Sequence, residues 1–177
     1  MLLLAKVRGT ILPDFAICVN GPIDLNYSSL KLTQGLNRIY DKRFVIELKR
    51  YVKVNHPEAV NQIQNVKNLR EFDEVYTAPV GGFMNRAHYY EVCSAKFYLA
   101  RIEIPTIMIT AEDDPFVYVE DYQKSKLSSS IVLHVEKHGG HMGYLSRTDL
   151  GYERWLDRAL KVYLEAASSS FCKASLT

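Results

Sequence analysis

The sequence has few cysteines, no long apolar run and little net charge, and each of these absences excludes a class of protein. Its three cysteines, Cys18, Cys93 and Cys172, are widely separated and form no Cys-x-x-Cys pair. This spacing excludes a disulfide framework and a zinc ribbon, and it favours a reducing compartment. No apolar run approaches the roughly 20 residues of a membrane span, and the first five residues are too short for a signal-peptide core. We therefore expect a cytoplasmic protein, and a net charge of +2 indicates no nucleic-acid partner.

Three short apolar runs predict strands, at residues 15–19, 106–111 and 131–135. A long stretch of helical pattern separates the first two runs, and further helical patterns follow the second and the third. Helices between core strands predict an α/β fold with a mostly parallel sheet, within one domain of 177 residues. We expect core segments at residues 1–24 and 101–166, a helical cap at residues 25–100 and a disordered tail at residues 167–177.

The helical stretch opens with a long pattern from Ser28 to about His56, and we expect Ser28 or Ser29 to cap its first turn. Two sets of apolar residues each share a face: Leu32, Leu36, Ile39 and Tyr40, then Phe44, Leu48, Tyr51 and Val52. The basic residues lie mostly on the opposite side: Lys42, Arg43, Lys49, Arg50 and Lys53. Such a segment presents either a solvated face or a contact with an anionic lipid surface, and both interpretations stay open.

Shorter patterns complete the chain. Residues 1–8 have the pattern of a helix end that Gly9 stops. Residues 79–82 indicate a loop rich in glycine and flanked by aromatic side chains. Further helices are predicted at residues 58–70, 87–95 and 151–166, with a surface helix or loop at residues 120–126.

Polar turns follow the second and third strands and carry the residues best suited to catalysis. Asp114 precedes Pro115, and a residue before proline is held extended, which fixes the direction of its carboxylate. Asp113 is the second choice. Two glycines precede His141 and allow the loop to bring its imidazole over the sheet, with His138 as the second choice. A carboxylate and an imidazole at neighbouring strand ends suit the orienter and base of a hydrolytic nucleophile.

Two other interpretations of these residues remain. The aspartates can simply cap a turn and the histidines can simply pack. The histidines at positions 134, 138 and 141 also suggest a metal site, with His134, His138 and His141 as ligands. The sequence disfavours a metal, because Gly-Gly splits the His-x-x-His pair and no carboxylate or cysteine lies at a usual ligand spacing. We therefore expect no metal and no other cofactor.

The nucleophile that would complete such a pair is missing from the sequence. A catalytic serine is expected on a strained strand-to-helix turn of the form Gly-x-Ser-x-Gly. No serine of the chain lies in that motif, and no cysteine does either. On its residues alone, the chain contains two of the three members of a catalytic triad.

Several ordered segments of the sequence resemble one family. They are GPIDL at 21–25, GLNRIYDKRFV at 35–45, LREFDEVYTAPVGGF at 69–83, HYYEVCSA at 88–95, IPTIMITAEDDPF at 104–116 and HGGHMGY at 138–144. Over about residues 1–166, the chain resembles the C-terminal half of the YheT-like α/β-hydrolases, which include the ABHD-type esterases. This resemblance implies a partial α/β-hydrolase fold with a helical cap. It also implies a serine hydrolase that acts on carboxylic esters, such as acylglycerols or other lipid esters.

The same resemblance assigns residue roles. Asp114 takes the position of the triad acid and His141 that of the triad base, while the serine is expected a few residues upstream of Met1. The cap is expected to shape a pocket for a small-molecule ester, with three candidate lining residues: Phe72, Tyr76 and Phe83.

Two further expectations follow from a missing nucleophile and a thin sheet. We predict that the chain alone does not hydrolyse esters. An open sheet edge beside residues 15–19 also invites self-association. The alternative function is a non-catalytic regulatory or interaction module derived from the same fold.

Overall fold

The computed structural model describes residue 4, residues 12–148 and residues 151–174. Its centre is a parallel sheet of order β1–β2–β3, formed by Ala16–Val19, Thr106–Ala111 and Ile131–Glu136. The register aligns Cys18 with Met108 and Met108 with Leu133. All three predicted strands are confirmed to within one residue, and the α/β fold class is confirmed with them.

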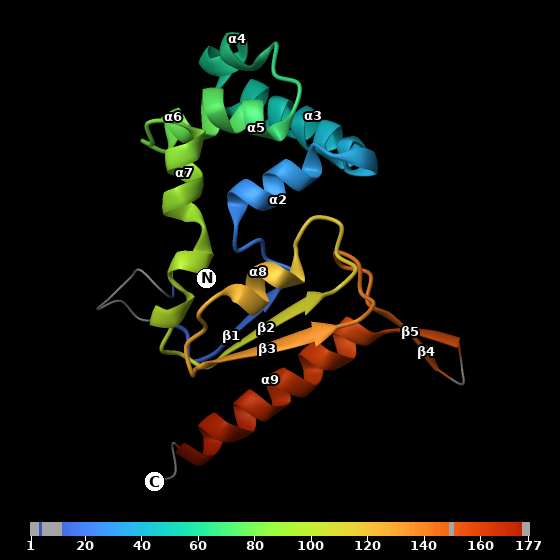
Figure 1. Ribbon diagram of the computed structural model, residues 1–177. Coiled ribbons are helices and arrows are strands. Elements are labelled where there is room, and N and C mark those ends of the chain that lie inside the picture. Colours follow the sequence, from blue (N-terminus) through green and yellow to red (C-terminus); the bar gives the residue numbers. More distant parts are fainter. Residues whose placement is uncertain (1–3, 5–11, 149–150, 175–177) are drawn as a thin grey trace.

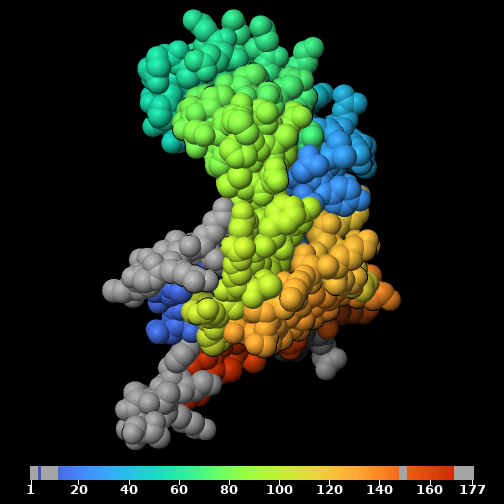
Figure 2. All heavy atoms as spheres, turned by 60° about the vertical axis from the view of Figure 1, so that its left-hand side comes forward, coloured from blue at the N-terminus to red at the C-terminus, as the bar shows by residue number. Residues whose placement is uncertain are grey.

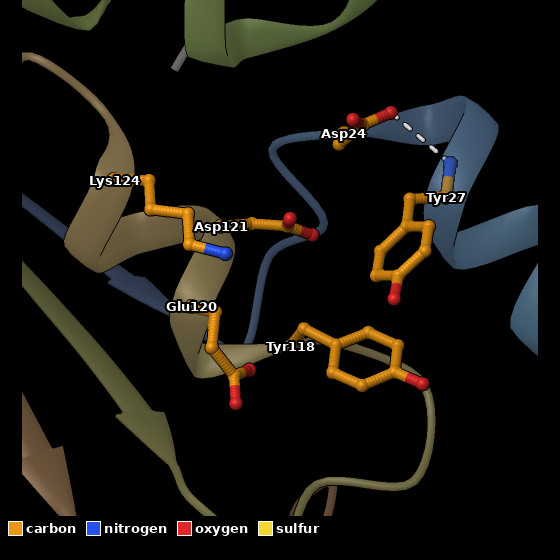
Figure 3. Close-up of a pocket in the computed structure, with 6 residues that line it drawn as sticks. All are labelled: Asp24, Tyr27, Tyr118, Glu120, Asp121 and Lys124. Carbon is orange, nitrogen blue, oxygen red and sulfur yellow. Dashed lines mark hydrogen bonds between the residues drawn. The ribbon is translucent and has the colours of Figure 1, made fainter.

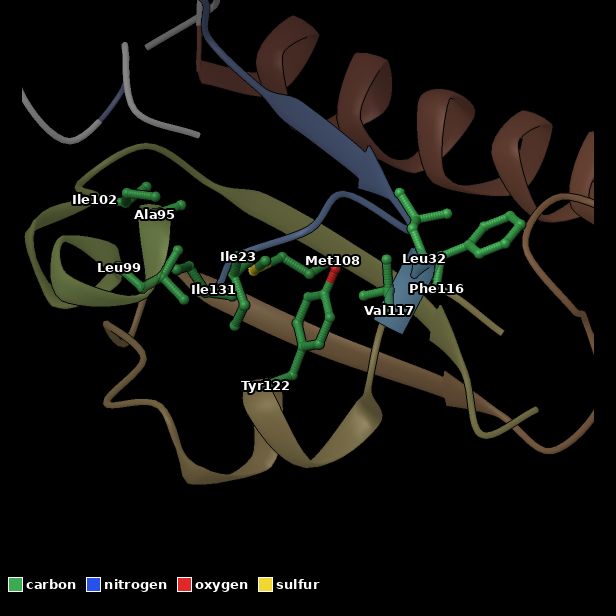
Figure 4. Packing of buried hydrophobic residues seen from close by; sticks show 10 residues of the cluster. All are labelled: Ile23, Leu32, Ala95, Leu99, Ile102, Met108, Phe116, Val117, Tyr122 and Ile131. Carbon is green, nitrogen blue, oxygen red and sulfur yellow. The ribbon is translucent and has the colours of Figure 1, made fainter. Parts of the chain in front are cut away.

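Helices cover both faces of this sheet (Figure 1). Because side chains alternate along a strand, Ile107 and Ile109 of β2 pack toward helix α9, Trp155–Ala174. Met108 points the other way, into a cluster with Tyr122 of helix α8, Val119–Lys124 (Figure 4). Both faces of β2 are therefore buried, as its continuous apolar run predicts.

Strand β1 is half-buried at all four positions, although a continuous apolar run is typical of a strand that is buried on both faces. Ile17 and Val19 still pack toward α9, and Cys18 packs toward the α8 side. Among the described residues, β1 pairs with β2 alone, so its outer edge carries no neighbouring strand. That open edge explains the partial exposure.

The segment between β1 and β2 consists of helices joined by turns and loops, and it forms a layer beside the sheet (Figure 1). Figure 2 shows the last part of this segment, coloured yellow-green, descending as a narrow column to the sheet. The helices are α2 Leu25–Leu32, α3 Arg38–Asn55, α4 Val60–Ile63, α5 Leu69–Phe72, α6 Ala78–Val80 and α7 Arg86–Cys93. Tighter or wider turns join them: η1 Gly35–Asn37, η2 Pro57–Ala59, the π-helical η3 Asp73–Thr77, η4 Ala95–Phe97 and η5 Leu99–Arg101. The division into a core and a cap with the predicted boundaries stays a proposal.

The start of this layer differs from the prediction. Helix α2 begins at Leu25, and the carboxylate of Asp24 caps it by accepting a hydrogen bond from the backbone N–H of Tyr27 (3.1 Å). Ser28 and Ser29 lie inside α2 and are buried, so the prediction that one of them is the cap is wrong. The long helical pattern is also divided, because Gly35 takes a left-handed conformation (φ +51°) between α2 and α3.

The apolar faces predicted for α3 are confirmed only in part, because Val52 is buried and Leu48 packs against the same cluster while most of the other predicted residues are exposed. Helix α3 buries Asp41, Val45 and Val52 against the helices that follow it. Asp41 can be buried because its carboxylate accepts a hydrogen bond from the backbone N–H of Leu69 (2.8 Å). The large apolar residues left exposed on and just before α3 include Leu36, Ile39, Tyr40, Phe44 and Tyr51.

The last part of the chain contains a hairpin that the sequence did not predict. Strands β4 Leu145–Thr148 and β5 Gly151–Arg154 pair in antiparallel fashion. Helix α9 therefore begins at Trp155, four residues later than predicted. It continues to Ala174, so the expected disordered tail is wrong for residues 167–174.

Two shorter predictions are corrected by the structure, and a third falls mostly on residues that the structure does not describe. The helix predicted at residues 58–70 is instead η2, α4 and the start of α5, with Asn68 as the cap of α5. Residues 79 and 80 of the expected loop belong to α6. The helix end expected at residues 1–8 lies outside the described residues except for Leu4. Within the part of the chain that is described, no helix has the length and apolarity that crossing a bilayer requires.

Candidate active site

The carboxylate of Asp114 is held by its own turn, directly after β2. Its Oδ1 accepts hydrogen bonds from the backbone N–H groups of Phe116 (2.8 Å) and Val117 (3.0 Å). The side chain is fully buried. Because a buried carboxylate needs several donors, these two N–H groups explain how Asp114 is accommodated. They also leave Oδ2 available for a partner outside the turn.

That partner is His141, which follows β3. The Nδ1 atom of His141 lies 3.0 Å from Oδ2 of Asp114. The imidazole is 40% exposed, and it makes a T-shaped contact with the Phe116 ring at 4.9 Å between centroids. Among the described residues, no serine, threonine or cysteine side chain donates a hydrogen bond to Nε2 of His141. The arrangement is an accessible imidazole oriented by a buried carboxylate, which suits a general base.

The second-choice residues lie beside this pair but form no comparable contact. The Nδ1 atom of His138 is 3.8 Å from Oδ2 of Asp113; the His138 side chain is largely exposed to solvent and that of Asp113 is half exposed. Asp113 instead directs Oδ1 to the backbone N–H groups of Gly139 (2.8 Å) and Gly140 (2.7 Å). The structure thus brings Asp114 and His141 together as the close pair, and it gives Asp113 a contact with the turn that carries His141.

The two backbone donors, led by the N–H of Gly139, lower the pKa of the Asp113 carboxyl. A carboxyl whose pKa is lower in the folded state stabilises that state above its unfolded pKa. The contribution is lost as the pH falls through the folded value. Because Asp113 is half exposed, solvent screens the effect, and we expect a local loosening of the turn in acid.

We therefore expect the amide signals of Gly139 and Gly140 to titrate together in acid. In ¹⁵N-labelled protein their midpoint should lie below 3.8, the ordinary value for an aspartate. The Asp113→Asn variant is the matched control and should remove this titration. A midpoint at or above the ordinary value in the unmodified chain would contradict the assignment of these donors.

A residue that sequence reasoning missed holds the same turn from the other side. Asn20 lies just beyond β1 and is 2% exposed. Its Nδ2 donates hydrogen bonds to the backbone oxygens of Gly140 (3.1 Å) and His141. The hydroxyl of Tyr144 donates to its Oδ1 (2.6 Å). Burial raises the pKa of Tyr144 to about 12, so the hydroxyl keeps its proton. The only sequence signal was an Asn-Gly pair after a strand, which is typical of any turn.

The aromatic residues predicted to line a pocket occupy different surroundings. Phe72 and Tyr76 are buried in the cluster between α3 and the later helices. Phe83 packs against the ring of Tyr89 at 5.3 Å between centroids. Residues that are buried in a core line a substrate pocket only if the helices rearrange, so their role in a pocket stays a prediction.

The residues of the alternative metal site are not gathered around one point. Both ring nitrogens of His134 are already paired, Nδ1 with the hydroxyl of Tyr163 (2.5 Å) and Nε2 with Glu136 (2.7 Å). Across residues 12–148 and 151–174, no group of three or more His, Cys, Asp or Glu side chains is arranged to hold a metal ion. In the described part of the chain, His134, His138 and His141 therefore form no common ligand set.

A separate hollow of about 370 Å³ lies between the start of α2 and helix α8 (Figure 3). Its lining residues are Asp24, Tyr27, Tyr118, Glu120, Asp121 and Lys124. Asp24 is engaged as the cap of α2 and in an ion pair with Lys96. Because neither Asp114 nor His141 lines this hollow, it is separate from that pair of residues.

Comparison with known proteins finds relatives that are named as esterases and lipases. No family model matches the sequence. The chain is 34% identical over 185 residues to the YheT esterase of Escherichia coli (strain K12), an alignment that covers 94% of the chain and 52% of the relative. It is 28% identical over 168 residues to a monoacylglycerol lipase of Saccharomyces cerevisiae, covering 85% of the chain and 37% of that protein. It is 28% identical over 109 residues to the phospholipase ABHD3 of Mus musculus, covering 60% and 26%.

The chain spans about half the length of the YheT esterase and smaller parts of the other two relatives. Its parallel sheet has helices on both faces, and a helical segment is inserted in the sequence between β1 and β2. This arrangement is a partial α/β-hydrolase fold. The chain belongs to the YheT-like, ABHD-type family of α/β-hydrolases, and it corresponds to about half the length of the YheT relative.

Proposed function

We propose that this chain supplies the acid and the base of a serine hydrolase that acts on carboxylic esters. The observation that carries the proposal is the 3.0 Å contact between Nδ1 of His141 and the buried Oδ2 of Asp114. The names of the relatives, an esterase, a monoacylglycerol lipase and a phospholipase, support esters of lipids as the substrate class.

The proposed reaction uses each atom of the pair. Nε2 of His141 takes the proton of a serine hydroxyl while the serine oxygen attacks the ester carbonyl. Asp114 holds the proton of the imidazole on Nδ1 and stabilises the imidazolium that forms. Backbone N–H groups hold the oxyanion. The imidazolium then protonates the leaving alcohol, and water releases the carboxylic acid from the acyl-enzyme.

The serine is the part of this centre that the chain does not contain. The sequence has no Gly-x-Ser-x-Gly turn, and the YheT esterase is about twice as long as the region it shares with the chain. Without the nucleophile, only binding and the polarity of the site remain to accelerate the reaction. We therefore propose that the chain needs a segment with that turn, supplied by a longer form of the protein.

The test compares hydrolysis of a p-nitrophenyl ester by the 177-residue chain and by a longer form that includes a Gly-x-Ser-x-Gly turn. We expect turnover by the longer form, its loss in the His141→Ala variant, and none above the buffer rate by the chain alone. Turnover by the chain alone that depends on His141 would show that the chain has its own nucleophile. A longer form without turnover would instead support the non-catalytic interaction module.

Two contacts predicted from the sequence stay predictions. Helix α3 carries six basic and two acidic residues, and its exposed face includes Ile39 and Val54 beside Arg43 and Arg50. This combination suits an anionic lipid surface. The open edge of β1 suits pairing with another strand, either from a second copy or from another segment.

A further inference from the structure

The turn that carries His141, residues 138–144, is wound tightly on itself. The backbone oxygen of Gly139 accepts hydrogen bonds from the N–H groups of Gly143 (2.9 Å) and Tyr144 (3.0 Å). A side chain at position 139 would meet the Tyr144 ring at 2.4 Å, so only glycine fits there. These contacts fix the shape of the turn. They do not fix its position relative to the strand ends, because all their partners lie within the turn.

The first external anchor comes from the end of β2. Oδ1 of Asp113 accepts hydrogen bonds from two N–H groups of the turn, those of Gly139 and Gly140. Hydrogen bonds to an ionised carboxylate are roughly twice as strong as those between neutral groups. Asp113 is also the immediate neighbour of Asp114, so the acid and this anchor lie at adjacent positions just after β2.

The second external anchor comes from the end of β1. The side-chain amide of Asn20 donates to the backbone oxygens of Gly140 and His141, and it accepts from the Tyr144 hydroxyl. Asn20 is itself fixed by a hydrogen bond from its backbone N–H to the oxygen of Ile109 (2.9 Å). It has a left-handed backbone conformation (φ +45°), which Asn tolerates better than most residues. The amide thus uses both donors and its acceptor in one buried network.

We propose that Asp113 and Asn20 are positioning residues that hold the turn between the ends of β1 and β2 and so set the imidazole of His141 against Asp114. Each end of the acid–base contact has its own support. Asp114 is held by the N–H groups of its own turn, and His141 is held through the backbone groups that Asp113 and Asn20 bind. The catalytic consequence of this positioning rests on the proposed function, while the positioning itself does not.

The first experiment measures the imidazole directly in the 177-residue chain and needs no nucleophile. Long-range ¹H–¹⁵N spectra report which ring nitrogen of His141 carries the proton. We expect the neutral ring to hold its proton on Nδ1, facing Asp114. In Asp113→Ala this preference should fall toward a mixture of the two tautomers. Asp113→Asn keeps an acceptor oxygen and should restore most of it.

Asn20→Gly tests the other anchor, because glycine accepts the left-handed backbone and removes only the amide. It should shift the His141 tautomer in the same direction as Asp113→Ala. Matched controls are Glu112→Ala, which removes the neighbouring exposed carboxylate, and Asn65→Gly, which removes an exposed amide elsewhere. Unchanged ring signals in both Asp113→Ala and Asn20→Gly would overturn the proposal. If one variant does not fold, the other and the Asp113→Asn comparison still decide it.

The second experiment uses the longer form with a nucleophile. Misplacing a catalytic group by about 1 Å can cost about 10²-fold in rate. We expect kcat in Asp113→Ala and Asn20→Gly to fall by about that factor while KM changes little, with Asp113→Asn partly rescued. An unchanged kcat would overturn the catalytic role of the anchors. If the unmodified longer form shows no turnover that depends on His141, the proposed function fails, and the tautomer measurement still decides the positioning.

Discussion

Replacing His141 with alanine in a longer form that carries the serine should lower kcat by about 10⁶-fold, the loss seen when a triad base is removed from a serine protease. The structure gives the reason. His141 is the imidazole that faces the buried carboxylate of Asp114, and its Nε2 remains for the serine. Without it, the serine hydroxyl keeps its proton and the leaving alcohol receives none. Steady-state hydrolysis of a p-nitrophenyl ester measures the effect.

His138→Ala is the matched control for this prediction. It removes a histidine from the same turn, three residues earlier, whose side chain is 77% exposed and makes only a 3.8 Å contact with Asp113. We expect this variant to keep most of the activity. Equal losses in the two variants, or a greater loss in His138→Ala, would show that the base has been assigned to the wrong histidine.

Asp114→Asn should lower kcat by about 10⁴-fold, with the fold intact. An asparagine at this position still offers an oxygen to the N–H groups of Phe116 and Val117, so the turn keeps its shape. The group facing His141 then carries no charge and can present N–H donors, which favours a proton on Nε2. That tautomer cannot accept the serine proton. The measurement is kcat, with the thermal midpoint as a check on folding.

Asp113→Asn provides the comparison, because it changes the neighbouring aspartate in the same way. Asp113 binds backbone N–H groups of Gly139 and Gly140, and an asparagine oxygen can replace that contact. Its kcat should therefore fall far less than that of Asp114→Asn. A reversed order would mean that the sequence's second choice, Asp113, is the catalytic acid.

The sheet and the contact between Asp114 and His141 could be predicted because their signals are local. Continuous apolar runs predicted β2 and β3, and the carboxyl ends of parallel strands meet at one edge of a sheet. The turns after those strands could then be expected to bring Asp114 and His141 close together. No knowledge of distant contacts was needed for that step.

The remaining features depend on partners far away in the sequence. Asn20 contacts a turn 120 residues later, and nothing in its own neighbourhood indicates this. The buried face of α3 includes Asp41, because the N–H of Leu69 satisfies its carboxylate. The hairpin of β4 and β5 contains few apolar residues, so its alternation was too weak to separate it from the helix that follows.

Covalent labelling by an alkyl fluorophosphonate tests the acid–base pair most directly, because this reagent reacts with a serine that a nearby base activates. We predict that the longer form is labelled at one serine within a Gly-x-Ser-x-Gly turn, located by mass spectrometry. Labelling should become very slow in His141→Ala and in Asp114→Asn, and the 177-residue chain should not be labelled. Labelling at the same rate in His141→Ala, or labelling of a serine within the chain itself, would contradict the assignment of Asp114 and His141 as its acid and base.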